Sequence, residues 1–192
     1  MLLFEGDTEG EFYRRIIAEK VPERKIRIAF DNLKGISTNI NNKVIAKITK
    51  HIANNPLENQ VHVFLGIDRE GGRECESPMD IEYIQAKLGQ DLSRIYSINE
   101  IIATQDIESW FFIDIDNIFR FLRVPKSKRN PSRYTNHEGL NNRDLSKLFR
   151  QHKKVYSKGN KVEGLLDSLD LNKIYNGSQD LTDGIQRMVD LV

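Results

Sequence analysis

Acidic residues stand directly after three apolar segments, with types and spacing that are typical of a divalent-metal site. In chain order they are Glu5, Asp7, Glu9, Asp68, Glu70, Asp106 and Glu108. Residues two apart in an extended chain share a face, so Asp68 and Glu70 should point to the same side. Carboxylates this close repel one another unless a cation or protons lie between them. Oxygen-rich clusters suit Mg²⁺ or Mn²⁺, and the sequence therefore predicts such an ion here.

Each of these residues also has a purely structural interpretation. Glu5 and Glu9 would favour the positive N-terminal end of the first helix. Asp68 and the Gly71-Gly72 pair would form a turn at the end of a strand, and Glu108 would cap a helix. We favour a shared site, because three unrelated features would otherwise have to meet at one edge of a sheet.

The elements that must position these acids alternate between strand and helix patterns. Strands are expected over residues 1–4, 25–30, 61–67, 94–98 and 101–104, and helices over residues 39–53 and 79–88. A further helix should start at Thr8, because Glu11 stands at the capping-box spacing. This alternation predicts an α/β fold with a mostly parallel sheet flanked by helices. Ligands of such sheets bind at the carboxyl ends of the strands, which is where the acids lie.

The pattern changes after about residue 106 and becomes helical. Helices are expected over residues 107–112, 116–122, 143–156, 161–169 and 181–191, with a polar loop over residues 125–142. We therefore expect an α/β catalytic domain over residues 1–115 and a helical C-terminal extension over residues 116–192, packed on the same domain.

Composition and charge exclude several classes of protein. The chain has 192 residues, of which 39% are hydrophobic and 30% charged, and one cysteine, which rules out an internal disulfide framework. The longest apolar stretch, residues 61–67, is far shorter than the ~20 residues of a membrane span. No basic region precedes an apolar one at the N-terminus, so we expect a cytoplasmic protein without membrane contact.

Positive charge is concentrated in one basic segment, residues 123–161, which carries a net charge of +10 against −9 for the rest of the chain. Lysine and arginine supply most of the affinity of proteins for polyanions. The residues expected to bind nucleic acid are Arg143, Lys147, Arg150, Lys153, Lys154 and Lys158. Tyr134 and Tyr156 would either stack on bases or be half-buried amphipathic residues. A lysine-rich solvated helix remains the alternative for the whole segment.

Two groups of motifs resemble a known family. Glu5-Gly6-Asp7-Thr8-Glu9, followed by Asp68-x-Glu70 after a buried strand, is similar to the TOPRIM domain, and in its Glu-Gly-x-Thr-Glu form to the overcoming-lysogeny-defect nucleases. The second half resembles a small TOPRIM-like family of prokaryotic proteins known mainly as a domain of unknown function. The matching features there are Ile107-Glu108-Ser109-Trp110 with Asp114, Tyr156-Ser157-Lys158, and Leu169-Asp170-Leu171 with Ile174. Glu70 departs from that pattern, which usually has Asp.

The resemblance implies a TOPRIM-like fold and metal-dependent cleavage of a phosphodiester bond in DNA or RNA. Its central Mg²⁺ or Mn²⁺ ligands would be Glu5, Asp68 and Glu70, with Glu9 and Glu108 as further ligands. Lys158 would neutralise charge that develops on the phosphate, or else would be an ordinary solvated lysine. The family also implies an ATPase partner protein and a role in prokaryotic defence against phage.

Two other functions remain open from the sequence. The first is a non-catalytic nucleic-acid-binding or adaptor subunit of an ATPase complex, in which the acidic cluster is inactive. The second is another Mg²⁺-dependent phosphoryl-transfer enzyme, such as a phosphatase or nucleotidyltransferase. Metal bound by the carboxylates would separate the first from the nuclease, and a polymeric substrate would separate the second from it.

Overall fold

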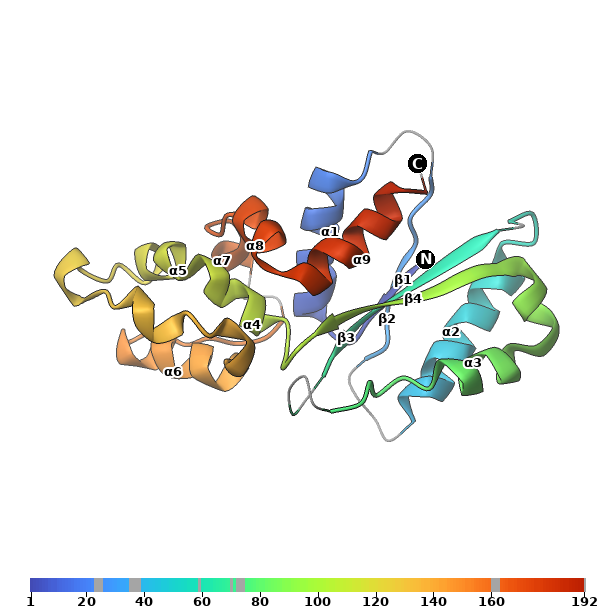
Figure 1. Ribbon diagram of the computed structural model, residues 1–192, viewed down its shortest axis with the longest axis horizontal. Helices are drawn as coiled ribbons and strands as arrows, with labels where there is room; N and C mark the ends of the chain where they lie inside the picture. Colours follow the sequence, from blue (N-terminus) through green and yellow to red (C-terminus); the bar gives the residue numbers. More distant parts are fainter. Residues whose placement is uncertain are drawn as a thin grey trace.

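A central parallel sheet organises the computed structural model, which describes residues 1–22, 26–34, 39–58, 60–69, 71, 75–159 and 163–191 (Figure 1). Its strands are β1 (Leu2–Phe4), β2 (Phe30–Asn32), β3 (Val61–Asp68) and β4 (Ile95–Ala103). The strand order is β2-β1-β3-β4, and every neighbouring pair is parallel. The predicted α/β class is therefore confirmed, and the carboxyl ends of β1, β3 and β4 point to one edge.

Two helices cover each face of the sheet. Helices α1 (Asp7–Lys20) and α9 (Gln179–Val189) lie on one face, and α2 (Ile40–Asn54) and α3 (Ile81–Leu88) lie on the other (Figure 1). Helix α2 buries Ile40, Val44, Ile48 and Ile52, whose spacing of four residues puts them on one side of a helix. A 3-10 helix, η1 (Gly89–Arg94), links α3 to β4.

Two strand predictions need correction. The second strand begins at Phe30 instead of residue 25, and Lys25 lies outside the described residues. Ile26 and Ile28 do pack against the core from an irregular segment, so their alternation marked burial but not sheet pairing. The two strands predicted over residues 94–98 and 101–104 form one continuous strand, β4. Asn99 and Glu100 remain in the ladder, opposite Phe64 and Leu65 of β3.

The second half of the chain is helical, as predicted, with differences at the ends of its elements. Its helices are α4 (Glu108–Phe111), α5 (Ile115–Phe121), α6 (Asn142–Gln151), α7 (Glu163–Leu166), α8 (Leu171–Gly177) and α9, with 3-10 turns η2 (Phe112–Asp114), η3 (Lys126–Lys128), η4 (Pro131–Tyr134) and η5 (His137–Gly139). Helix α8 was not predicted, and α6 ends before the predicted residue 156. Lys161 lies outside the described residues.

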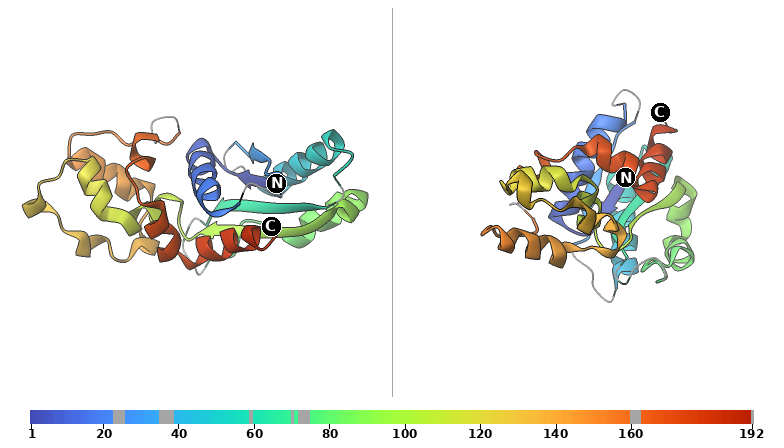
Figure 2. Two further views of the ribbon diagram at one scale, coloured as in Figure 1. Left: turned by 90° about the horizontal axis from the view of Figure 1, so that it is seen from above. Right: turned by 60° about the vertical axis from the view of Figure 1, so that its left-hand side comes forward.

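Helices α4 to α8 lie at the carboxyl edge of the sheet, whereas α9 returns onto one of its faces, and Figure 2 shows the resulting elongated shape. One hydrophobic core joins the two parts, since Phe64 of β3, Trp110 of α4, Phe149 of α6 and Ile185 of α9 belong to the same buried cluster. Helix α9 approaches β4 closely at Gly184, where an added Cβ would stand 2.6 Å from Ile101. Among the described residues, no helix is long and apolar enough to cross a membrane.

Candidate active site

The first two predicted ligands, Glu5 and Asp68, meet at the carboxyl edge of the sheet. Glu5 follows β1 directly and Asp68 ends β3, and these strands are neighbours with Phe4 opposite Gly66. The backbone N–H of Asp68 donates a hydrogen bond of 3.0 Å to Glu5 Oε1. Both side chains are buried, with 5% and 7% of their residue surface exposed. The prediction that these two acids share one edge is confirmed.

Glu9 reaches the same place from the first turn of α1 and is also buried. Gly6 makes room for it, because an added Cβ at Gly6 would stand 2.8 Å from Glu9 Oε2. The predicted capping box at Thr8 is wrong. Helix α1 begins at Asp7 with Gly6 as its N-cap, and Thr8 Oγ1 instead accepts a hydrogen bond of 2.9 Å from the N–H of Gly159.

Glu108 and Asp106 come from the segment that follows β4. Glu108 is fully buried, and the N–H of Ile107 donates to Asp68 Oδ1 over 3.1 Å, which ties this segment to the end of β3. Asp106 Oδ2 accepts a hydrogen bond of 2.8 Å from the N–H of Asn142 at the start of α6. Within the described part of the chain, Asp106 Oδ1 and Glu108 Oε2 are buried without a hydrogen bond. Buried polar atoms in this condition are rare in folded proteins and are found where strain, catalysis, a water molecule or an ion accounts for them.

Lys158 stands among these acids although it lies far along the chain. Its Nζ is 3.3 Å from Glu108 Oε2, 3.7 Å from Glu9 Oε1 and 3.8 Å from Asp68 Oδ2. Two residues earlier, the hydroxyl of Tyr156 donates a hydrogen bond of 2.6 Å to Glu108 Oε1. Lys158 is therefore not an ordinary solvated lysine of the basic segment.

Burial and charge perturb the acid–base properties of this cluster. Burial, together with the carboxylates of Glu9 and Glu5, raises the pKa of Asp68 well above its usual value. Burial and the neighbouring Asp106 raise the pKa of Glu108 to about 7, against the opposing effects of Lys158 and Tyr156. Burial alone would lower the pKa of Lys158, but the surrounding carboxylates, with Glu108 first, outweigh it and raise that pKa.

The donor set suits a hard divalent ion, but the present spacing suits an ammonium group. The carboxylate oxygens stand 3.3–3.8 Å from Lys158 Nζ, whereas Mg²⁺ binds oxygen at about 2.0–2.1 Å. Accordingly, no three acidic, histidine or cysteine side chains of the described residues are arranged to hold a metal ion as they stand. Glu70, predicted as a central ligand, lies outside the described residues.

The predicted nucleic-acid-binding residues fall into two groups. Arg143, Lys147 and Arg150 of α6, with Lys153 after it, are exposed. Lys154 is half-buried instead: its Nζ donates a hydrogen bond of 2.7 Å to the carbonyl of Phe121 and lies 4.3 Å from the centre of that ring. Lys154 therefore has a structural role that its place in the basic segment does not indicate.

The two candidate stacking tyrosines are engaged inside the protein. Tyr134 stacks on Phe112 with 5.5 Å between ring centres. Tyr156 packs edge-on against Phe149 in addition to its bond to Glu108. The half-buried alternative describes both residues.

Three residues near the cluster have roles that the sequence analysis did not assign. Asp106 was named among the acids but not as a ligand, and Tyr156 was considered only for base stacking or as a half-buried residue, although each stands two residues from a predicted member of the cluster. Tyr13 of α1 had no sequence signal. It is buried, and an added Cβ at Gly66 would stand 2.9 Å from its hydroxyl oxygen. Burial and the charges of Asp68, Glu9 and Glu5 raise its pKa well above the usual value.

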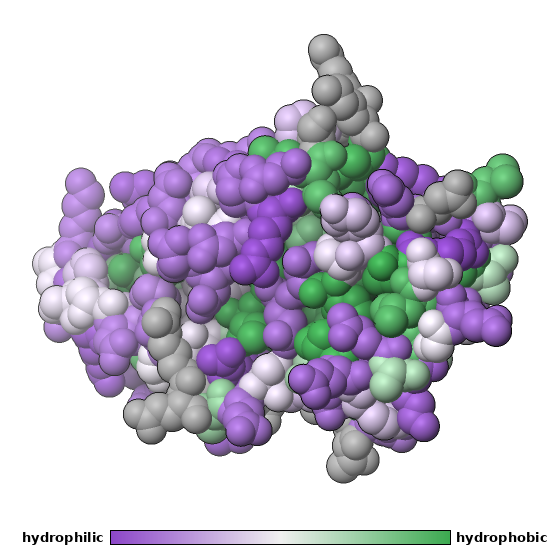
Figure 3. Space-filling model, turned by 45° about the vertical axis from the view of Figure 1, so that its right-hand side comes forward, coloured by the Kyte–Doolittle hydropathy of each residue, from purple (hydrophilic) through white to green (hydrophobic). Residues whose placement is uncertain are grey.

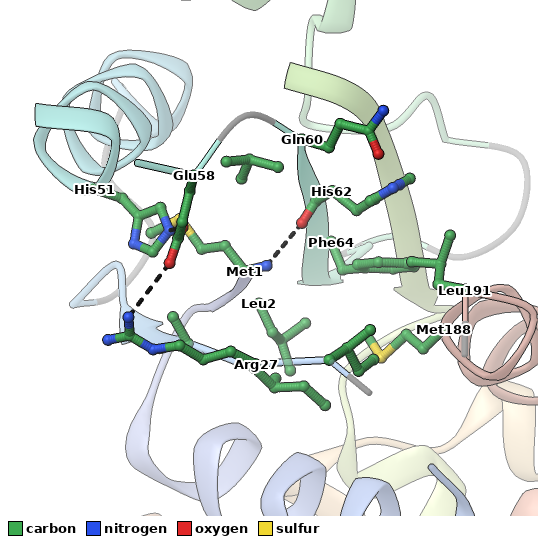
Figure 4. A pocket seen from close by; sticks show the side chains of 14 residues that line it. Met1, Leu2, Arg27, His51, Glu58, Gln60, His62, Phe64, Met188 and Leu191 are labelled. Carbon is green, nitrogen blue, oxygen red and sulfur yellow. Dashed lines mark hydrogen bonds and ion pairs between the residues drawn. The ribbon is translucent and has the colours of Figure 1, made fainter. Parts of the chain in front are cut away.

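A separate cavity of about 340 Å³ opens at the opposite, amino edge of the sheet (Figure 4). Apolar and polar side chains line it together, among them Met1, Leu2, Arg27, His51, Glu58, His62, Phe64, Met188 and Leu191. In the view of Figure 3, hydrophobic residues gather on the right-hand part of the surface and the left-hand part is mainly hydrophilic. None of the predicted site residues is among the described residues that line this cavity.

Comparison with known proteins identifies the family. No curated protein and no solved structure matches the chain. Nothing in these comparisons links the chain to TOPRIM proteins or to overcoming-lysogeny-defect nucleases. The model of one family matches residues 4–188, a range that includes all the acids of the cluster and Lys158. The chain therefore belongs to the DUF4276 family, which is described as a domain of unknown function.

Proposed function

We propose that this protein is a metal-dependent nuclease that hydrolyses phosphodiester bonds of nucleic acid. One observation carries the proposal: carboxylates from three chain segments converge on a single cation, Lys158 Nζ, at the carboxyl edge of a parallel sheet. Buried carboxylates repel one another, and an arrangement that gathers them costs stability unless cations offset it. Clusters maintained in this way are concentrated at functional sites.

The residues that would hold the ion are Glu5, Glu9, Asp68 and Glu108, and the sequence pattern adds Glu70. A bound divalent ion would supply activation of the attacking water and charge for the leaving oxygen. Lys158 would stabilise negative charge on the phosphate, as an ammonium group aimed at the reacting centre does. Tyr156 keeps Glu108 oriented through its 2.6 Å hydrogen bond.

The position of α6 supports nucleic acid as the substrate. Its first residue, Asn142, is anchored to Asp106, and the chain that follows its end leads to Tyr156 and Lys158 in the cluster. Helix α6 is therefore tied to the carboxylate cluster at its start, which supports a role for its exposed cations near the site. Because such cations attract phosphates of any sequence, they would hold a strand along the site without reading bases.

The resemblance supports the same function, through Glu5 and Asp68 for the TOPRIM pattern and through Lys158 for the TOPRIM-like family of unknown function. It also leads us to propose a cytoplasmic protein that acts with an ATPase partner in defence against phage. The localisation, the ATPase partner and the role in defence rest on the resemblance alone. Fold by itself does not establish function, so it adds no support to these three points.

The test is cleavage of labelled DNA and RNA, single- and double-stranded, with Mg²⁺, with Mn²⁺ and with EDTA. We expect cleavage with metal, none with EDTA, and none by Asp68→Asn, while Asp183→Asn, at an exposed position of α9, behaves as wild type. Undiminished cleavage in EDTA would contradict the metal mechanism. Binding without cleavage would favour the adaptor alternative, and hydrolysis of mononucleotides alone would favour another phosphoryl-transfer enzyme.

A further inference from the structure

The acidic cluster contains a positive charge from the protein itself, the ammonium group of Lys158. Lys158 Nζ lies within 4 Å of carboxylate oxygens from Glu9, Asp68 and Glu108, which are nearly or fully buried. Its own side chain remains 41% exposed. The ammonium therefore stands at the mouth of the cluster, between buried negative charge and solvent.

The carboxylates still have unused capacity for a ligand. Asp106 Oδ1 is buried and accepts no hydrogen bond within the described part of the chain, and the buried Glu108 Oε2 has only the ion pair with Lys158 Nζ at 3.3 Å there. A single positive charge at 3.3–3.8 Å faces several carboxyl groups. This leaves the cluster short of positive charge and of close oxygen-binding partners.

We propose that Lys158 is the resident counter-ion of the carboxylate cluster, and that a divalent cation binds there by displacing its ammonium group. The proposal rests on the proposed function, since it concerns the metal of that site. A divalent ion at about 2.1 Å attracts each carboxylate about three times as strongly as a monovalent one at 3.3 Å. Both cations cannot occupy the same space, so binding of one excludes the other from this position.

The backbone around Lys158 is fixed, which confines the exchange to its side chain. On one side, Tyr156 is held by its bond to Glu108; on the other, the N–H of Gly159 is held by Thr8 Oγ1. The long lysine stem can then swing outward while its Cα stays in place. A displaced ammonium would be delivered to the mouth of the site, where a substrate phosphate would lie beside the metal.

If the Lys158 ammonium competes with the metal ion, replacing Lys158 should have opposite effects on the metal-free and the metal-bound protein. Without metal, Lys158→Met leaves the carboxylates unneutralised, and the melting temperature should fall. With metal, the variant no longer has to give up an ion pair, and it should bind more tightly. Lys50→Met is the matched control, because Lys50 is exposed on α2 and makes the same change of charge outside the cluster and outside the basic segment.

The experiment measures Mn²⁺ affinity directly, by electron paramagnetic resonance of free Mn²⁺ in metal-stripped protein. We expect Lys158→Met to bind on the order of 10-fold more tightly than wild type, a size common for coupled sites, and Lys50→Met to be unchanged. Equal or weaker binding by Lys158→Met overturns the counter-ion role. If wild type still cleaves nucleic acid with Mg²⁺, the proposed function survives that result; if no protein binds Mn²⁺, both proposals fail.

A second measurement needs no variant and covers the case in which Lys158→Met does not fold. Wild-type protein is acetylated briefly with and without Mn²⁺, and the modification of each lysine is read by mass spectrometry. Displacement should move Lys158 Nζ away from the carboxylates and expose it to the reagent, so its acetylation should speed up relative to Lys50, an exposed lysine of α2. A rate that stays the same or falls on adding Mn²⁺ overturns the proposal.

Discussion

The hydroxyl of Tyr156 and the carboxylate of Glu108, 48 residues apart in the chain, are joined by a hydrogen bond of 2.6 Å. Lys158, two residues further on, reaches the other oxygen of the same carboxylate. Residues two apart in an extended segment share a face, so one short stretch of chain addresses both oxygens of Glu108. The orientation of this buried acid thus depends on the segment that follows α6.

Tyr156→Phe should loosen Glu108 without removing the ring that packs against Phe149. Loss of a hydrogen bond to a buried carboxylate should cost about 1–3 kcal/mol in the free energy of unfolding, measured by urea titration. Mn²⁺ affinity should fall as well, because Glu108 is no longer held in place. Tyr134→Phe removes a hydroxyl away from the cluster and serves as the control; equal effects of the two variants would show that Tyr156 has no positioning role.

The stability of the metal-free protein should depend on pH through Glu108. Burial and Asp106 raise its pKa to about 7 in the folded protein, above the ordinary value of 4.5. Between these values the folded state binds more protons than the unfolded state, so the contribution of Glu108 to stability is fully present below pH 4.5 and is lost as pH rises through 7. The raised pKa of Asp68 acts in the same direction.

The check is thermal unfolding between pH 5 and pH 8 in the presence of a chelator. Glu108→Gln should reduce the loss of stability over this range, because glutamine does not titrate. Glu82→Gln, at an exposed position of α3, should leave it unchanged. A pH dependence identical in wild type and Glu108→Gln would contradict the raised pKa.

Gly6→Ala should impair the site more than the fold. Gly6 has an extended backbone with φ −147° and ψ 178°, which alanine adopts, but the new Cβ would stand 2.8 Å from Glu9 Oε2. The Glu9 carboxylate must then move, and Mn²⁺ affinity should drop, while the unfolding free energy changes by less than about 1 kcal/mol.

Gly10→Ala provides the contrasting case. Its Cβ would stand 2.5 Å from the ring of Phe4 in the core, and overpacking there should cost about 1–3 kcal/mol. Urea unfolding and Mn²⁺ titration of both variants distinguish the two effects. A Gly6→Ala protein with unchanged Mn²⁺ affinity would remove Glu9 from the proposed ligands.

The exposed cations of α6 should contribute to nucleic-acid affinity in a salt-dependent way. Lys147→Ala and Arg150→Ala should weaken binding to all sequences alike and flatten the log–log salt dependence by about 0.7–0.9 for each phosphate that the variant no longer neutralises. Fluorescence anisotropy across a salt series measures both quantities. Salt-independent binding would remove nucleic acid as the partner of this surface.

Lys154→Ala should behave differently from these two variants. Its ammonium is engaged with the carbonyl and ring of Phe121, so its removal should lower the unfolding free energy. Its effect on the salt slope should be small by comparison. A Lys154→Ala protein that is fully stable but binds nucleic acid weakly would show that this lysine contacts substrate after all.

Local patterns in the sequence determined the class of fold and the place of the acids. The spacing of Ile40, Val44, Ile48 and Ile52 defines a helix face by itself, and the apolar run that becomes β3 requires burial on both sides. Glu5 and Asp68 follow strands, and parallel strands end at a common edge, so their proximity follows from class and position. These conclusions depend only on the periodicity of residues along a helix or a strand.

The tertiary structure decided which local possibility was realised. Thr8 and Glu11 have the spacing of a capping box, yet Thr8 bonds to Gly159, because the start of α1 is packed against the later chain. Asn99 and Glu100 look like a break between strands, yet pairing with β3 carries β4 through them. A favourable long-range partner outweighs a local preference of a few tenths to about 1 kcal/mol.

Pairings across the chain were the part of the site that no local pattern could determine. Lys154 and Lys158 stand in the same basic segment, but one is held by Phe121 and the other by three carboxylates. Sequence spacing describes neighbours along one element, whereas these contacts depend on how separate elements pack. The sequence by itself therefore determined which residues could form the cluster, and packing of the helical extension on the sheet edge decided which cation entered it.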